Sequence, residues 1–177
     1  MVREVKWTKY LWLSLLLFGA FMLEYFSIFV IEFMILHVDI WNKNWVITFS
    51  CLICCKILTF IDWHTLKVFG EVQGKNAYQF CAQYLYYLFE VMLVTLIIMY
   101  GQKAIETLLK KESPIPFGGI ILAVTWGAFH FVSRGAGLEI WNGISTMIFS
   151  VLSGVMYLRL NRKCLYSYLF IAVGYLL

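Results

Sequence analysis

Apolar segments close to twenty residues long recur along this chain, and they restrict its possible folds more than any other feature. A soluble protein would have to expose several of them to water, because one core cannot cover so many. The composition agrees, since 62% of the 177 residues are hydrophobic, whereas a soluble domain has roughly half. The sequence therefore predicts an integral membrane protein made of helices.

Six apolar segments account for most of the chain. They cover residues 10–38, 45–60, 78–100, 117–132, 140–158 and 165–177. The last has 13 residues, which is about two thirds of a full crossing at a rise of 1.5 Å per residue. The predicted fold is an all-α, polytopic bundle that forms one domain over residues 1–177, with five or six segments crossing the membrane.

Two polar stretches separate these segments. Residues 61–76 are charged and contain Gly70 and Gly74, which predict an interrupted, non-helical connection. Residues 101–113 look amphipathic and predict a loop, which Pro114 and Pro116 end.

The second apolar segment decides the predicted orientation. It is short and carries Lys56, so it either crosses with a snorkelling lysine or lies partly in the interface. If all six segments cross and the amino terminus is inside, the cations within residues 103–111 and 159–163 fall outside. If the second segment does not cross, they join those of residues 3–9 on the inside. The positive-inside rule favours this second arrangement.

The net charge of +4 is spread over helix ends and loops, without a long basic block. This distribution argues against nucleic acid as a partner and favours contact with lipid head groups. We therefore expect membrane lipid, and another membrane protein or a peptide, as partners.

Five cysteines occur, and Cys51 and Cys54 form a C-x-x-C pair. Such a pair can bind metal or carry redox chemistry. The sequence offers no second pair with matching spacing, so we expect the cysteines to pack as small apolar side chains.

Ionisable residues at membrane depth are candidate sites, because each is costly in lipid unless it is paired or hydrated. Six fall in the predicted segments, namely Glu24, Glu32, His37, Lys56, Glu90 and His130. Glu24 and Glu32 lie about 80° apart around one helix, so both can face the bundle interior. Lys56 could neutralise one of them. A structural ion pair is the first interpretation of this trio, and a ligand or proton site is the second.

His130 closes the apolar run W-G-A-F-H at residues 126–130, where Gly127 lets another helix approach closely. We expect the imidazole to point into the bundle near the third and sixth segments, because a lipid-facing ring would lose its hydrogen-bond partners. A zinc site needs about three protein ligands. The sequence therefore predicts neither zinc nor another cofactor.

Residues 95–177 carry three stretches with a family resemblance. Residues 126–130, residues 153–159 (S-G-V-M-Y-L-R) and the pair Leu165-Tyr166 resemble the F-x-x-x-H, Gly-x-x-Tyr-x-Arg and Leu-Trp patterns of the CPBP family. This family, also called Abi, contains the CAAX prenyl-proteases and bacteriocin-processing intramembrane proteases. The resemblance implies a helical membrane fold and, in active members, peptide cleavage by glutamate and histidine residues.

The chain departs from this family at most catalytic positions. The E-E-x-x-x-R glutamates fall on Thr95 and Leu96, and the last histidine falls on Ala172. Peptide hydrolysis needs a base for water and a group that stabilises the oxyanion. His130 alone cannot supply both, so the resemblance implies a catalytically degenerate member.

Three functions follow as hypotheses for a protein of the prokaryotic plasma membrane. The first is a scaffold or binding partner for a membrane enzyme, a peptide or a lipid-linked molecule, for example in bacteriocin immunity or processing. The second is an active membrane hydrolase that uses His130 with Glu90, which lies about 7.5 Å along the helix from Thr95. The third is a transport component, against which the scarcity of Gly and Pro within the segments argues.

Overall fold

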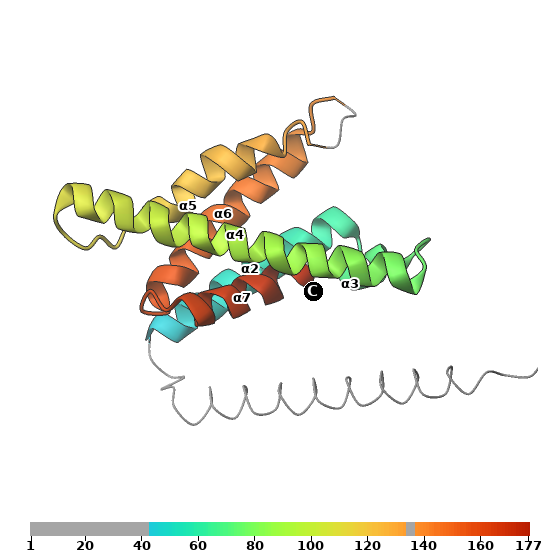
Figure 1. Cartoon of the computed structure of the whole chain (residues 1–177), viewed down its shortest axis with the longest axis horizontal. Coiled ribbons are helices and arrows are strands. Elements are labelled where there is room, and N and C mark those ends of the chain that lie inside the picture. The colour runs from blue at the N-terminus through green and yellow to red at the C-terminus, as the bar shows by residue number, and fades with distance from the viewer. Residues whose placement is uncertain (1–42, 134–136) are drawn as a thin grey trace, which may run out of the picture. The chain divides into compact units, whose positions relative to one another are not determined.

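Helices form the regular structure of residues 43–133 and 137–177, the parts of the chain that the computed structural model describes (Figure 1). They are α2 (Lys43–Trp63), α3 (Lys67–Val72), α4 (Ala77–Leu109), α5 (Phe117–Leu122), the π-helix η1 (Ala123–Gly127), α6 (Ile140–Arg159) and α7 (Cys164–Leu176). These residues contain no strand. The prediction of an all-α fold is confirmed for this part of the chain.

Within residues 43–133 and 137–177, three helical stretches are long and apolar enough to cross a membrane. They are Lys43–Val72, Ala77–Leu109 and Ile140–Arg159. The helices Phe117–Gly127 and Cys164–Leu176 are apolar but shorter, as predicted for the last segment. This pattern is consistent with an integral membrane protein. The first predicted segment, which contains Glu24, Glu32 and His37, lies outside the described residues.

The polar stretches contain more helix than predicted. Helix α2 continues to Trp63 and has 21 residues, so it is longer than the predicted segment 45–60. Gly70 was expected to interrupt a helix but lies inside α3, where the side chain of Trp63 covers it. Gly74, with φ +78°, lies in the turn before α4. Gly70 therefore does not end the helix, and the absence of a side chain there leaves room for the Trp63 ring.

Residues 101–113 are also largely helical, because α4 runs on to Leu109 before Lys110 caps it in the left-handed conformation. The helix starts at a capping box formed by Asn76 and Gln79. Its extension is held by Gln102, whose side chain accepts a hydrogen bond from the Gly118 N–H at 3.0 Å. With 33 residues, α4 is about 50 Å long, and this exceeds the hydrocarbon thickness of about 30 Å.

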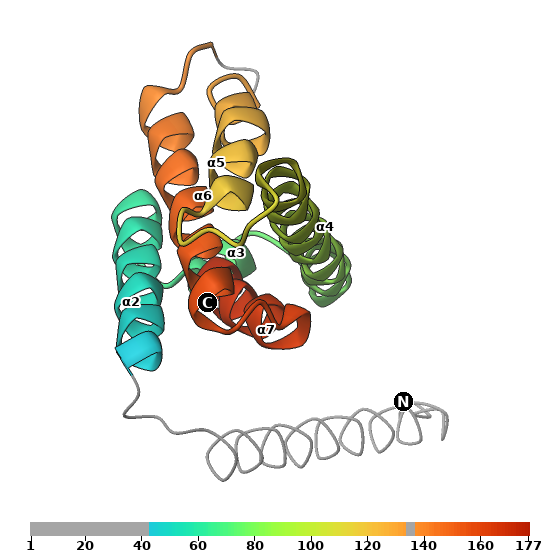
Figure 2. The ribbon, with the colours of Figure 1, turned by 90° about the vertical axis from the view of Figure 1, so that its left-hand side faces the viewer.

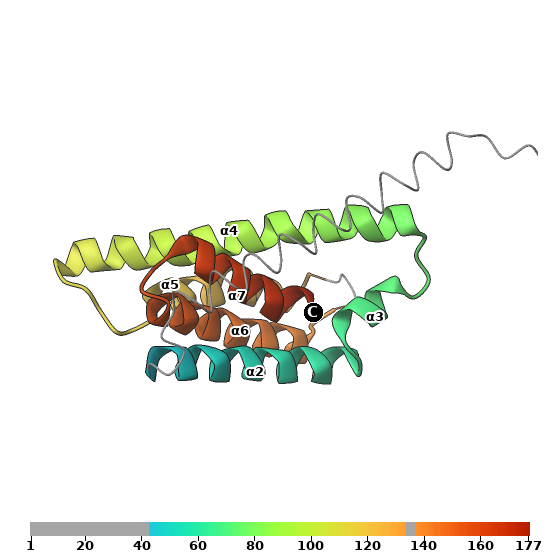
Figure 3. The same cartoon turned by 90° about the horizontal axis from the view of Figure 1, so that it is seen from below.

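Helix α6 lies at the centre of this bundle. It packs against α2, α5, η1 and α7, while α4 packs mainly against α5 and α7. Figures 2 and 3 show α2 and α4 on opposite sides, with α6 and α7 between them. This arrangement brings the end of α2, the start of α6 and the end of α7 close together.

Glycines allow α5 to approach both of its neighbours. A Cβ atom on Gly118 would lie 2.0 Å from the carbonyl oxygen of Ile98 in α4, and one on Gly119 would lie 2.9 Å from the Cα atom of Gly154 in α6. Backbone therefore meets backbone at both contacts, as is common where small residues pack membrane helices.

A polar cluster joins the α4–α5 turn to the α6–α7 turn. Glu106 accepts hydrogen bonds from Gln102 at 2.8 Å, from the Ser113 N–H at 3.0 Å and from Arg162 at 3.0 Å. Arg162 also pairs with the exposed Glu112 at 3.2 Å. The α4–α5 turn is thereby joined to the turn between α6 and α7.

Candidate binding cavity

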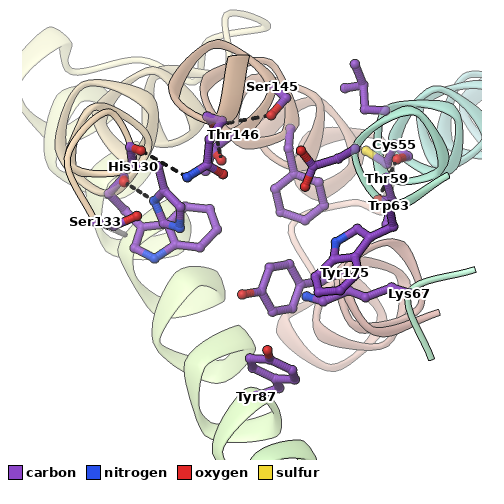
Figure 4. A pocket seen from close by; sticks show the side chains of 15 residues that line it. Cys55, Thr59, Trp63, Lys67, Tyr87, His130, Ser133, Ser145, Thr146 and Tyr175 are labelled. Atoms are coloured by element: carbon purple, nitrogen blue, oxygen red, sulfur yellow. Dashed lines mark hydrogen bonds between the residues drawn. The ribbon is translucent and has the colours of Figure 1, made fainter. Parts of the chain in front are cut away.

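A cavity of about 200 Å³ lies where α2, α6 and α7 meet (Figure 4). Its walls combine aromatic and polar side chains from six elements. They come from α2 (Cys55, Leu58, Thr59, Asp62, Trp63), α3 (Lys67), α4 (Tyr87), η1 and the residues after it (Trp126, His130, Ser133), α6 (Asn142, Ser145, Thr146, Phe149) and α7 (Tyr175). Such a concave mixture is typical of ligand sites.

His130 lies in the turn after η1, and its ring lines this cavity. Its Nδ1 atom lies 2.8 Å from the carbonyl oxygen of Trp126. Because a carbonyl oxygen only accepts hydrogen bonds, Nδ1 is the donor in this contact. The cavity also contains Tyr87 of α4 and Tyr175 of α7, which agrees with the expectation that His130 points towards the third and sixth segments.

The π-helix sets the positions of Trp126 and His130. It occupies Ala123–Gly127, directly before the histidine turn; single π-turns of this kind are frequent at functional sites. A Cβ atom on Gly127 would lie 2.9 Å from the Met147 side chain, so glycine allows α6 to pack closely here. The amide of Asn142 on α6 then donates to the His130 carbonyl oxygen at 3.0 Å.

Glu90 lies beside the cavity but is not among the residues of its walls. One carboxylate oxygen accepts a hydrogen bond from the Trp126 indole at 3.3 Å, and the other accepts one from the Tyr175 hydroxyl at 2.8 Å. The Trp126 ring also lies 4.5 Å from the His130 ring, measured between centroids. Glu90 and His130, the predicted catalytic pair, are therefore joined through Trp126 rather than by a direct contact.

A buried charged cluster extends from this cavity along α3 and α4. Lys67 and Glu71 are only 5% and 3% exposed. The Lys67 ammonium lies 3.6 Å from the ring centroid of Tyr175 and 4.4 Å from that of Tyr87. Glu71 accepts hydrogen bonds from Tyr87 at 2.6 Å and from Gln83 at 2.7 Å, and it forms an ion pair with Lys75.

This cluster was not predicted, because the charges and glycines of residues 61–76 indicated an interrupted, non-helical connection. The spacing of Lys67, Glu71 and Lys75 at i, i+4 and i+8 is the signal that could have revealed a helical face with paired charges. No such signal marked the uncharged members of the cluster, which are Gln83, Tyr87 and Tyr175. Tyrosines in particular are common at membrane interfaces, so their presence in an apolar segment did not indicate a site.

The structure describes some of the other candidate residues and not others. The Lys56 ammonium is buried and has no hydrogen-bond partner among residues 43–133 and 137–177, while its proposed partners, Glu24 and Glu32, lie outside the described residues. Cys51 and Cys55 are buried thiols, whereas Cys54 is exposed. The two buried ones fit the packing interpretation.

Thr95 and Ala172, the positions that the resemblance compares with catalytic residues, are not among the residues of the cavity wall. Thr95 and Ala172 are buried, and the Thr95 hydroxyl donates to the Val91 carbonyl oxygen within its own helix. In the described part of the chain, no group of three or more His, Cys, Asp or Glu side chains could hold a metal ion. The sequence expectation about zinc stays a prediction for metal analysis of the whole protein.

No protein-family model, curated protein or solved structure matches this chain.

Proposed function

We propose that this chain is a membrane binding protein, a degenerate relative of the CPBP intramembrane proteases that holds a partner instead of cutting it. The arrangement of Glu90 carries this proposal. Both of its carboxylate oxygens accept structural hydrogen bonds, from Trp126 and Tyr175, and it does not belong to the wall that contains His130. A general base needs an oxygen within reach of the water that it activates.

The residues at the remaining family positions support the same interpretation. The Thr95 hydroxyl donates a hydrogen bond within its own helix, and Ala172 has no group that could act as a base or ligand. The cavity persists without them, lined by rigid aromatic rings and a few polar groups. Such a site suits a membrane enzyme, a peptide or a lipid-linked molecule of a prokaryotic plasma membrane, in bacteriocin immunity or processing.

The test separates binding from catalysis with two substitutions. Glu90→Gln and His130→Ala should each leave the yield of a co-purified partner within about threefold of the parent, because interface energy spread over apolar and aromatic surfaces depends little on either group. Native membranes are extracted with mild detergent, and the partner is quantified by mass spectrometry. Expression level and thermal unfolding serve as controls for folding.

The second candidate function is a hydrolase with an altered site, and the Trp126 contacts favour it. The Trp126 indole donates a hydrogen bond to the Glu90 carboxylate, and its ring lies against the His130 ring. A rotation of this indole would let the Glu90 carboxylate and the His130 imidazole face each other directly. In proteoliposomes, cleavage of a membrane peptide that is lost in both Glu90→Gln and His130→Ala, at normal expression and partner binding, would replace the binding proposal. Accumulation of solute in the same liposomes would instead favour transport.

A further inference from the structure

Lys67 is a buried cation whose hydrogen-bonding capacity is unused by the described residues. Its side chain lines the cavity and is 5% exposed as a residue. In the described structure its ammonium lies over two tyrosine rings, at 3.6 and 4.4 Å, and the carboxylates of Glu71, Glu90 and Asp62 lie near enough to attract it without a hydrogen bond to it. An ammonium has three N–H donors, and ring faces stabilise its charge without accepting conventional hydrogen bonds. The cavity therefore presents donors that lack acceptors.

The rest of the cavity wall favours a ligand with a single negative charge. Figure 4 shows His130 and Ser133 on one side, Thr59 and Trp63 on the other, and Lys67 beside Tyr175 between them. Lys67 is the one lysine or arginine among the described residues of the wall, so the wall offers a ligand one full positive charge. A phosphodiester has one negative charge shared by two oxygens, and both oxygens accept hydrogen bonds.

The position of the cavity favours a phosphodiester that belongs to a lipid. Its walls come from the last turns of α2 and the first turns of α6, and both helices belong to stretches that are long enough to cross a membrane. The ends of such helices lie near the head groups. On α2, Ile57 and Phe60 are 53% and 55% exposed, and these apolar side chains could contact acyl chains.

We infer that the cavity binds the phosphodiester head of a phospholipid, with the Lys67 ammonium donating hydrogen bonds to its charged oxygens between the rings of Tyr87 and Tyr175. This inference rests on the proposed function, because it takes the cavity as a binding site. It adds the chemical class of the occupant and the residue that selects it.

Saturation binding with radiolabelled phosphatidylglycerol tests the inference on the full chain in detergent. We expect one saturable site, no comparable site for a diacylglycerol with the same acyl chains, and little displacement by inorganic phosphate. Lys67→Met keeps the length of the apolar stem but removes the charge, and it should weaken phosphatidylglycerol binding at least about tenfold, or about 1.4 kcal/mol. Lys110→Met, at an exposed position outside the cavity, is the matched control and should bind as the parent does.

A second variant covers the case in which Lys67→Met fails to fold. Ser145→Leu fills the cavity from α6 while leaving Lys67 and Glu71 intact, and it should also abolish phosphatidylglycerol binding. Equal binding of diacylglycerol, full displacement by inorganic phosphate, or unchanged binding by both folded variants would overturn the inference. If phosphatidylglycerol does not bind but a partner still co-purifies, the lipid inference fails and the proposed function stands. Peptide cleavage that depends on His130 would refute the proposed function whatever the lipid result.

Discussion

A single methyl group added at Gly118 should strongly destabilise the bundle. The Cβ atom of Gly118→Ala would lie 2.0 Å from the carbonyl oxygen of Ile98 and 3.0 Å from its Cα atom. Both are backbone atoms of α4, so no side-chain rotation can relieve the overlap, and α5 must move away from α4. We expect a loss of about 3 kcal/mol, at the upper end of the usual cost of overpacking. Thermal unfolding in detergent, followed by circular dichroism, measures it.

Gly174→Ala is the matched control for this prediction. Its Cβ atom would meet the nearest side-chain atoms at 3.5 Å, which is ordinary van der Waals contact, and it lies inside α7. Because alanine is favoured over glycine in a helix by about 1 kcal/mol, this variant should be as stable as the parent or more stable. Equal stability of the two alanine variants would show that α5 does not pack against α4 at this distance.

Removing the Glu71 carboxylate should have an effect of similar size at the opposite end of the bundle. Glu71→Ala deletes the acceptor for Tyr87 and Gln83 and the ion-pair partner of Lys75. It also removes one of the negative charges that lie near the buried Lys67. Breaking a buried charged cluster in this way typically costs about 3–5 kcal/mol, and the loss should appear as a lower unfolding temperature and faster proteolysis near α3.

Glu112→Ala provides the comparison for Glu71→Ala. Glu112 also pairs with a cation, Arg162, but its side chain is 80% exposed, whereas that of Glu71 is 3% exposed. An exposed pair contributes about 0–1 kcal/mol, so this variant should unfold close to the parent. If Glu71→Ala and Glu112→Ala lose the same small amount, the cluster around Lys67 is not buried in the folded protein.

The helical class and the approximate positions of five segments could be predicted from sequence, because long apolar runs are a local property. Residues 45–60, 78–100 and 140–158 lie within helices, and residues 165–177 lie on α7 except for Leu177. The segment predicted over 117–132 begins as predicted, but it gives way to a turn at His130. The predicted ends were less accurate. Gly70 lies within α3, where an added Cβ atom would meet the Trp63 side chain at 2.7 Å, so glycine allows this close packing. Helix α4 continues past Tyr100 because residues 102–109 (Q-K-A-I-E-T-L-L) are mostly good helix formers. The first difference involves a contact between elements, whereas the second follows local helix propensity.

The candidate site depended on contacts that no local pattern encodes. Local patterns were enough to predict a membrane-type composition, helical segments and a short set of ionisable residues, including His130 and Glu90. Helix packing, in contrast, brings Glu90 to Trp126 and Tyr175, which are 36 and 85 residues away, and places Lys67 between two tyrosine rings from different helices. Hydropathy and spacing report which face of a helix is apolar. The partner that a buried polar group finds depends on how the helices pack, because each such group must satisfy its charge and hydrogen bonds with whatever neighbour the fold brings to it.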